Sequence, residues 1–181
     1  MTFTEIEKQT LLALARESIC KALLYKHKPL NKTIEITETL LQHCGAFVSL
    51  HRNEKLRGCI GCFEATQPLF EVVKEMALSA AFHDYRFPHV TASEIDSIRI
   101  EISVLTPLKK IDSIDEIQLG KHGIYIEKGY QSGTFLPQVA IETHWTKEEF
   151  LGHCSMDKAG LEWNSWQNAD LYIYEAIVFS E

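Results

Sequence analysis

The segment Ile98–Leu105 constrains the fold most, because apolar and polar side chains alternate along it without interruption. Its isoleucines and valine fall on one side of an extended chain, while Arg99, Glu101 and Ser103 fall on the other. A period of two predicts a β-strand with one buried face and one polar face. Strands of this kind are typical of antiparallel sheets, in which one face can stay in contact with water.

The other periodic segments mix strands and helices. Alternating or β-branched runs predict strands, and apolar residues at helical spacing predict helices. Besides 98–105, the predicted strands are 47–50, 56–62, 123–127, 134–136 and 171–179. The predicted helical segments are 3–26, 38–43, a helix that begins at Pro68, 113–117 and 146–158, with loops at 27–32 and 83–89. Because no regular strand–helix–strand rhythm appears, we expect an α+β fold with a mainly antiparallel sheet and flanking helices.

Length and composition indicate one globular domain that spans residues 1–181. Of the 181 residues, 45% are hydrophobic, which is enough for a core. The net charge is −7, and the 18 basic residues are dispersed among 25 acidic ones, so we expect no nucleic-acid binding. No apolar run approaches the about 20 residues of a membrane-spanning helix. The first residues do not resemble a secretory signal, so we expect a cytoplasmic protein without a membrane partner.

The cysteine pattern argues against disulfides and metal. Five cysteines form an odd set, and without an export signal we expect them to be reduced. Cys59 and Cys62 form a C-x-x-C, but redox motifs of this type open a helix, and this segment is predicted as a strand. Residues three apart on a strand point to opposite faces. With the histidines scattered along the chain, we expect neither a redox pair nor a metal site.

Within the predicted strand 56–62, two glycines flank a cysteine in the sextet Leu56-Arg57-Gly58-Cys59-Ile60-Gly61, or LRGCIG. Glycine inside a strand usually marks a bulge or a close approach of backbones. The sextet resembles the signature of the AMMECR domain family, which in microbes is protein A of the AmmeMemoRadiSam system. Segments similar to the family's other blocks follow in the same order at 68–69, 80–87, 101–107, 120–123, 136–140 and 158–161.

The resemblance carries expectations about fold and partners. It implies an α+β domain with a larger and a smaller subdomain, and it places the sextet in a central groove between them. It also implies an association with a Memo-like protein and a radical SAM enzyme. No reaction and no cofactor follow from it. We therefore expect a groove centred on Cys59 that receives a small molecule.

Cys59 is the main candidate for a catalytic residue. The glycines on either side remove steric cover, so that the thiol or the adjacent amides can meet another group closely. The thiolate is the reactive form of cysteine, and Arg57, two residues away and predicted on the same strand face, would favour it. The alternative is a buried cysteine that acts as a small hydrophobic residue, with glycines that serve only backbone packing.

Glu101 and His122 are the candidate proton carriers. Glu101 lies on the polar face of its predicted strand, where it can act as a general acid or base or simply face solvent. His122 lies in Gly120-Lys121-His122-Gly123, which lacks the spacing of a phosphate-binding loop. It can take part in acid–base chemistry, or it can be a turn histidine with one backbone hydrogen bond.

Further polar and small residues are candidate contacts for a substrate. Asp84 and Arg86 can form an ion pair or bind an anion. Gln138 lies in the predicted loop after Pro137, where polar groups can line a groove. The full set of candidate binding residues is Arg57, Gly58, Gly61, Asp84, Arg86 and Gln138.

The sequence therefore favours a small-molecule enzyme or a cofactor-handling component that acts with Memo-like and radical SAM partners. In this interpretation Cys59 is a nucleophile or an acid–base group. The alternative is a non-catalytic interaction module whose groove receives a segment of a partner protein. A Cys59→Ser variant separates the two, because catalysis would be lost while a protein interface would tolerate a nearly isosteric change.

Overall fold

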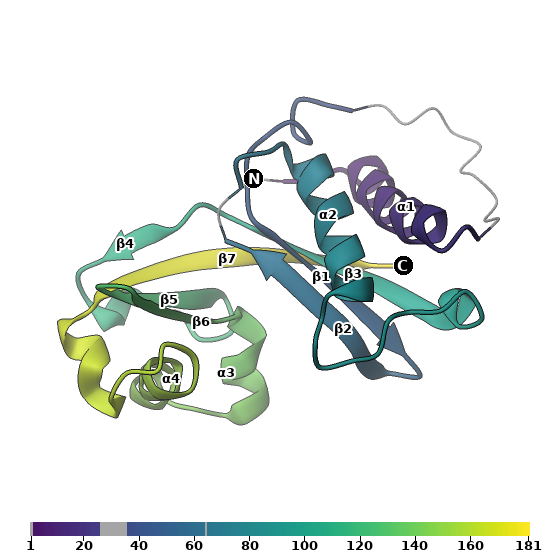
Figure 1. The fold of residues 1–181 in the computed structure, drawn as a ribbon. Helices are drawn as coiled ribbons and strands as arrows, with labels where there is room; N and C mark the ends of the chain where they lie inside the picture. The colour runs from purple at the N-terminus through teal and green to yellow at the C-terminus, as the bar shows by residue number, and fades with distance from the viewer. Residues whose placement is uncertain (1, 26–35, 64) are drawn as a thin grey trace. The chain divides into compact units, whose positions relative to one another are not determined.

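The computed structural model describes residues 2–25, 36–63 and 65–181 (Figure 1). Two compact units divide the chain, one made of Met1–Leu105 with Ile177–Glu181 and the other of Thr106–Ala176. The strand registers described in both units are antiparallel. Helices accompany the strands in each unit, so the fold is α+β, as the sequence predicts.

In the first unit, two helices pack on one face of an antiparallel sheet (Figure 1). The strand order is β2-β1-β3, followed by the C-terminal end of β7. Apolar residues of both helices and of the sheet's inner face, among them Leu11, Ile19, Val73, Leu50 and Ile100, form the core. The elements are α1 (Glu5–Ala22), β1 (Ala46–Arg52), β2 (Lys55–Cys62), α2 (Leu69–Phe82) and β3 (Ile98–Leu105).

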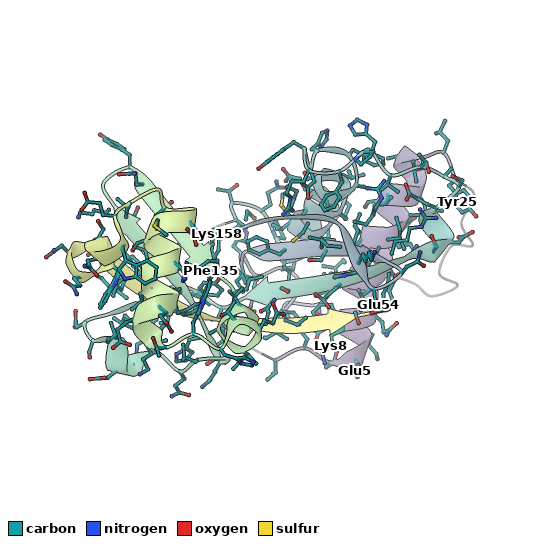
Figure 2. All side chains as sticks on the ribbon, turned by 90° about the horizontal axis from the view of Figure 1, so that it is seen from below. Glu5, Lys8, Tyr25, Glu54, Phe135 and Lys158 are labelled. Carbon is teal, nitrogen blue, oxygen red and sulfur yellow. The ribbon has the colours of Figure 1, made fainter. Side chains whose placement is uncertain are left out.

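A capped helix start and the alternation of apolar and polar residues explain why α1 and β3 form. The Thr4 and Glu7 side chains form a reciprocal capping box at the start of α1. Next to it, Lys8 pairs with Glu5 on the outer surface of the helix (Figure 2). Along β3, the isoleucines and Val104 are buried, as the period of two predicts.

In the second unit, β7 is the central strand of the sheet. It pairs with β4 and with β5, and β5 pairs with β6. Phe150 and Leu151 lie in the core of this unit together with Ile124 and Phe135. The Lys158 ammonium lies 5.3 Å from the centre of the Phe135 ring (Figure 2). The elements are β4 (Lys109–Ile111), β5 (His122–Lys128), β6 (Gln131–Phe135), α3 (Pro137–Thr143), α4 (Lys147–His153) and β7 (Asp170–Ser180).

Several local predictions need correction. Residues 38–43 form turns and a bend rather than a short helix. Pro137 starts helix α3, whereas the sequence predicts a loop there. The predicted helix 146–158 is α4 followed by a π-helical turn, Cys154–Lys158. Strand β4 and the 3₁₀-helix Trp163–Asn168 are not predicted at all, and the predicted loop 27–32 lies outside the described residues.

No helix in the described part of the chain has the length and apolar character needed to cross a membrane.

Candidate functional site

The strand that carries the LRGCIG sextet is the second arm of a tight hairpin. The hairpin turns at Asn53 and Glu54, whose φ angles are 51° and 59°. A two-residue turn with both φ angles positive matches the right-handed twist of the flanking strands. The register then shifts between Leu50 and His51, which leaves Arg57 in a β-bulge. The simple alternation that predicts Arg57 and the cysteine on one face is therefore interrupted.

The thiol of Cys59 lies on the sheet face that points away from the helices. Its neighbour Gly58 faces α2, and Ile60 and Cys62 pack against the core of the first unit. Because successive side chains alternate, Cys59 points to the opposite face. There the Ser49 hydroxyl donates a hydrogen bond to Cys59 Sγ at 3.1 Å. Cys59 and Cys62 thus face opposite ways, as expected for a C-x-x-C in a strand.

Packing accounts for both glycines of the sextet. A Cβ atom at Gly58 would lie 2.2 Å from the carbonyl oxygen of Ala80 in α2. A Cβ atom at Gly61 would lie 2.3 Å from the ring of Phe47 on the adjacent strand. Both distances are too short for any side chain, so the backbone packing proposed in the alternative interpretation is present within the first unit.

Asp84 and Arg86, in the loop after α2, hold the main chain of Cys59. The Cys59 amide donates to Asp84 Oδ2 at 2.9 Å, and Arg86 Nη2 donates to the Cys59 carbonyl oxygen at 3.0 Å. Among the described strands β2 is an edge strand, so these two backbone groups point away from its one partner, β1. Arg86 also binds both oxygens of Asp84, through Nε at 2.9 Å and Nη2 at 2.7 Å. We call this arrangement the Asp84–Arg86 clamp.

The electrostatics of the clamp favour its charged form. The Asp84 side chain is only 2% exposed, whereas that of Arg86 is 46% exposed. Hydrogen bonds from the Arg86 side chain hold the pKa of the Asp84 carboxyl far below its usual range, and the Cys59 amide adds to this effect against the cost of burial. The same pairing raises the pKa of Arg86. Asp84 and Arg86 thus form the ion pair that the sequence allows, and the Arg86 side chain stays about half exposed.

Arg57 is directed to Glu94 and to the loop after α2. Its Nε and Nη2 donate to the two oxygens of Glu94 at 3.1 and 2.9 Å, and Nη1 donates to the Pro88 carbonyl oxygen at 2.8 Å. Burial opposes the ionisation of Glu94, but hydrogen bonds from Arg57 and Thr91 outweigh it and lower the pKa of Glu94. The cation that contacts the cysteine backbone is therefore Arg86 rather than Arg57.

Glu101 lies in the same cross-strand row as the cysteine. Ser49 on β1 is aligned with Cys59 on β2 and with Glu101 on β3. The Glu101 carboxylate, 27% exposed, has Oε1 at 3.8 Å from Nε2 of His51. Carboxylate, imidazole, hydroxyl and thiol therefore occupy adjoining positions on one face of the sheet.

The two other predicted residues, His122 and Gln138, lie in the second unit. His122 is buried, its Nδ1 accepts a hydrogen bond from the Gln118 amide at 3.2 Å, and its Nε2 lies 4.0 Å from Glu175. The bond from the Gln118 amide is the kind of backbone contact that the turn-histidine alternative predicts, and His122 itself is the first residue of β5. Gln138 lies half-buried in the first turn of α3.

Sequence reasoning missed Ser49, His51 and Glu94. Ser49 and His51 alternate with apolar residues along β1, which marks them as outward-facing. Their pairing with Cys59 and Glu101 depends on strand register, which the spacing of residues does not reveal. Glu94 precedes a predicted strand without any motif, so no signal could have identified it.

The site residues are not arranged as a metal centre. Within residues 2–25, 36–63 and 65–181, no group of three or more His, Cys, Asp or Glu side chains is placed to hold a metal ion. All five cysteines are free thiols. Two open pockets of about 440 and 450 Å³ lie in the second unit, lined by residues around Asp170, and none of the predicted site residues lines them.

Comparison of the chain with known proteins shows relatives in several archaea. The chain is 41% identical to Protein MK0488 of Methanopyrus kandleri, over 97% of this chain and 88% of that protein. It is 42% identical to Protein MJ0810 of Methanocaldococcus jannaschii, over 76% and 73% of the two chains. The crystal structure of the uncharacterized protein PH0010 from Pyrococcus horikoshii superposes with a TM-score of 0.82, at 36% identity and over 94% and 89% of the chains. Because the AMMECR1 family model also matches residues 12–179, the chain belongs to the AMMECR1 family.

Proposed function

We propose that the chain is a small-molecule enzyme or cofactor-handling component whose working group is the Cys59 thiol. The observation that most supports this is the placement of that thiol on the sheet face away from the helices, 3.1 Å from the Ser49 hydroxyl, while both of its free main-chain groups are held by the Asp84–Arg86 clamp. A reactive group acts best when its backbone is fixed and its side chain is accessible.

The remaining residues take roles that follow from their positions. Cys59 serves as nucleophile or acid–base group, and Glu101 in the same row serves as proton carrier. Arg86, about half exposed beside the cysteine, is the contact for an anionic group of the small molecule. His122 and Gln138 stay candidate site residues of the second unit.

Membership in the AMMECR1 family supports the proposed setting. The chain would act beside a Memo-like protein and a radical SAM enzyme, handling a small molecule that one of them produces or consumes. Its net charge of −7 argues against a nucleic-acid partner.

The experiment compares wild type with Cys59→Ser, and uses Cys62→Ser as a matched control because Cys62 faces the core. Protein isolated from cells that express the partner proteins is analysed by native mass spectrometry for a bound or covalently attached small molecule. We expect an adduct or ligand on wild type and on Cys62→Ser, and its loss from Cys59→Ser. Equal ligand content in all three proteins would refute a role for the thiol.

A non-catalytic interaction module is the second candidate. It is favoured by the packing role of Gly58 and Gly61, and by Tyr85, which is 95% exposed next to Arg86. Exposed aromatic and arginine side chains are frequent at protein interfaces. In this case Cys59→Ser would bind the Memo-like protein as wild type does, and Tyr85→Ala would bind it more weakly.

A further inference from the structure

A hollow in the surface of the second unit surrounds the first residues of β7. The two open pockets of about 440 and 450 Å³ have Ala169 and Asp170 in common as lining residues, so they adjoin along the start of this strand. Sites for small molecules usually have volumes of roughly 300–1,000 Å³. We call the two adjoining pockets the β7 trough.

The β7 trough forms because both neighbours of β7 end early. β4 and β5 lie on either side of β7 (Figure 1). The pairing of β4 with β7 ends at Ile111 and Leu171, and the chain then enters the 3₁₀-helix Ile114–Glu116. On the other side, the pairing of β5 with β7 ends at Glu127 and Asp170. The described strands therefore leave the first residues of β7 open to a ligand.

The floor of the trough is aromatic and apolar. Trp166, in the 3₁₀-helix Trp163–Asn168, lines the 440 Å³ pocket together with Ile111 and Leu171. The indole is half-buried and packs against the core of the unit. Its Nε1 atom is buried and has no hydrogen-bond partner within the described residues. A ligand in the trough therefore meets the carbon surface of the ring rather than its polar edge.

The rim of the trough carries both donors and acceptors of hydrogen bonds. Gln167 and Asn168 present exposed amides, and Asp112 presents an exposed carboxylate. The Lys110 ammonium and the Asp170 carboxylate are both about half exposed. An amide donates and accepts, a carboxylate accepts, and an ammonium donates. The rim can therefore pair with several neutral polar groups of one ligand.

The charges of the trough argue against a strongly charged ligand. Lys110 Nζ lies 2.7 Å from Asp170 Oδ1, and this contact raises the pKa of Lys110. An anion would have to displace Asp170 from Lys110, and a cation would have to displace Lys110 from Asp170. In the other pocket, Glu127 and Lys128 carry opposite charges side by side in the sequence. A wholly apolar ligand would leave the rim groups without partners, which is costly.

We propose that the β7 trough binds a neutral carbohydrate, with one sugar ring packed on Trp166. A sugar ring has a face of C–H groups, which suits an aromatic carbon surface, and a periphery of hydroxyls that donate and accept hydrogen bonds. Two adjoining pockets fit two linked sugar rings, so the ligand class is a disaccharide or a longer glycan. This site goes beyond the proposed function, because Cys59 lies in the first unit.

The test is a titration of the isotope-labelled full chain, followed through its amide and indole NMR signals. The probes are the neutral disaccharides maltose, cellobiose and lactose, with choline chloride and sodium phosphate as charged probes. We expect at least one disaccharide to shift the signals of residues 166–170, and neither charged probe to do so. The proposal is overturned if no disaccharide shifts these signals, or if choline or phosphate binds there more tightly.

Variants of the helix Trp163–Asn168 then locate the contacts. Gln167→Ala should weaken binding about three- to tenfold, because one hydrogen-bonding side chain is lost. Asn164→Ala is the matched control, since Asn164 is an exposed amide on the same helix and does not line the trough. Trp166→Ala should weaken binding about tenfold.

Trp166→Phe provides a second variant at that position, because it keeps a ring in the core if the alanine variant unfolds. It should retain part of the affinity, and circular dichroism establishes that each variant is folded. Cys59→Ser should bind the disaccharide as wild type does. Equal weakening by Gln167→Ala and Asn164→Ala, or full affinity in a folded Trp166→Ala, would contradict the assigned contacts and overturn the proposal.

Discussion

Replacing Asp84 with asparagine should weaken the edge of the first unit at Cys59. Asp84 accepts hydrogen bonds from the Cys59 amide, the Arg86 amide and two nitrogens of the Arg86 side chain, at 2.7–3.2 Å. Asparagine keeps one acceptor oxygen and turns an NH₂ group towards these donors. The substitution removes hydrogen bonds to a buried charge and leaves one amide unsatisfied. Together these changes should lower the free energy of unfolding by about 2–4 kcal/mol.

Because of where the tryptophans lie, the effect of Asp84→Asn on stability can be measured separately in the two units. Trp145, Trp163 and Trp166 all lie in the second unit, so their fluorescence reports on that unit, while hydrogen exchange of residues 55–62 reports on the clamp. Asp84→Asn should lower protection in 55–62 more than it shifts the fluorescence transition in urea. Asp96→Asn is the control, because Asp96 accepts one exposed bond from Tyr25, at 2.6 Å, which asparagine can also accept.

The pH dependence has a defined sign. Because the pKa of Asp84 is depressed in the folded chain, its contribution is complete above the unfolded pKa of about 3.9 and is lost as the pH falls below that value. The difference between wild type and Asp84→Asn should therefore be largest near neutral pH and should shrink in acid. Unchanged protection in 55–62 at neutral pH would refute the clamp as the anchor of Cys59.

Three further changes test the surrounding structure. Gly58→Ala would place a Cβ atom 2.2 Å from a carbonyl oxygen of α2 and should lower stability by about 1–3 kcal/mol in urea titration monitored by far-UV circular dichroism. Arg57→Lys removes a two-pronged contact with Glu94, and should cost about 1–3 kcal/mol in the same titration; no change would argue against that contact. The Thr37 hydroxyl chiefly lowers the pKa of Glu7 to about 2. The Glu7 carboxylate should therefore stop contributing to stability as the pH falls below its unfolded pKa. Glu7→Gln should abolish this part of the acid dependence.

The alternating strand and the caps were predictable because each is encoded locally. The burial of Ile98, Ile100, Ile102 and Val104 is encoded in the alternation of residues 98–105, although Ser103 on the predicted polar face is buried as well. The Thr4–Glu7 and Thr146–Glu149 pairs mark helix starts at the correct positions. The start of α3 was missed because proline both ends a strand and favours the first turn of a helix, and only tertiary packing decides between the two.

The sequence singles out residues of the first unit but does not reveal how they contact one another. Cys59, Glu101, Asp84 and Arg86 do lie together in the first unit, but the clamp joins residues 25 positions apart in the sequence and follows from how the loop after α2 folds back. The β-bulge that turns Arg57 away cannot be seen in a six-residue pattern. Ser49 enters the site through register alone.

The central claim, that Cys59 is the working thiol, is tested most directly by ranking the five cysteines by alkylation in the folded chain. Burial raises the pKa of the Cys154 thiol to about 12 and also raises the pKa values of Cys20 and Cys44, while Cys62 packs against the core. We expect Cys59 to react first and the three buried thiols to react only on unfolding. If Cys59 instead reacts last, and only after denaturation, the sextet is a packing element and the claim is wrong.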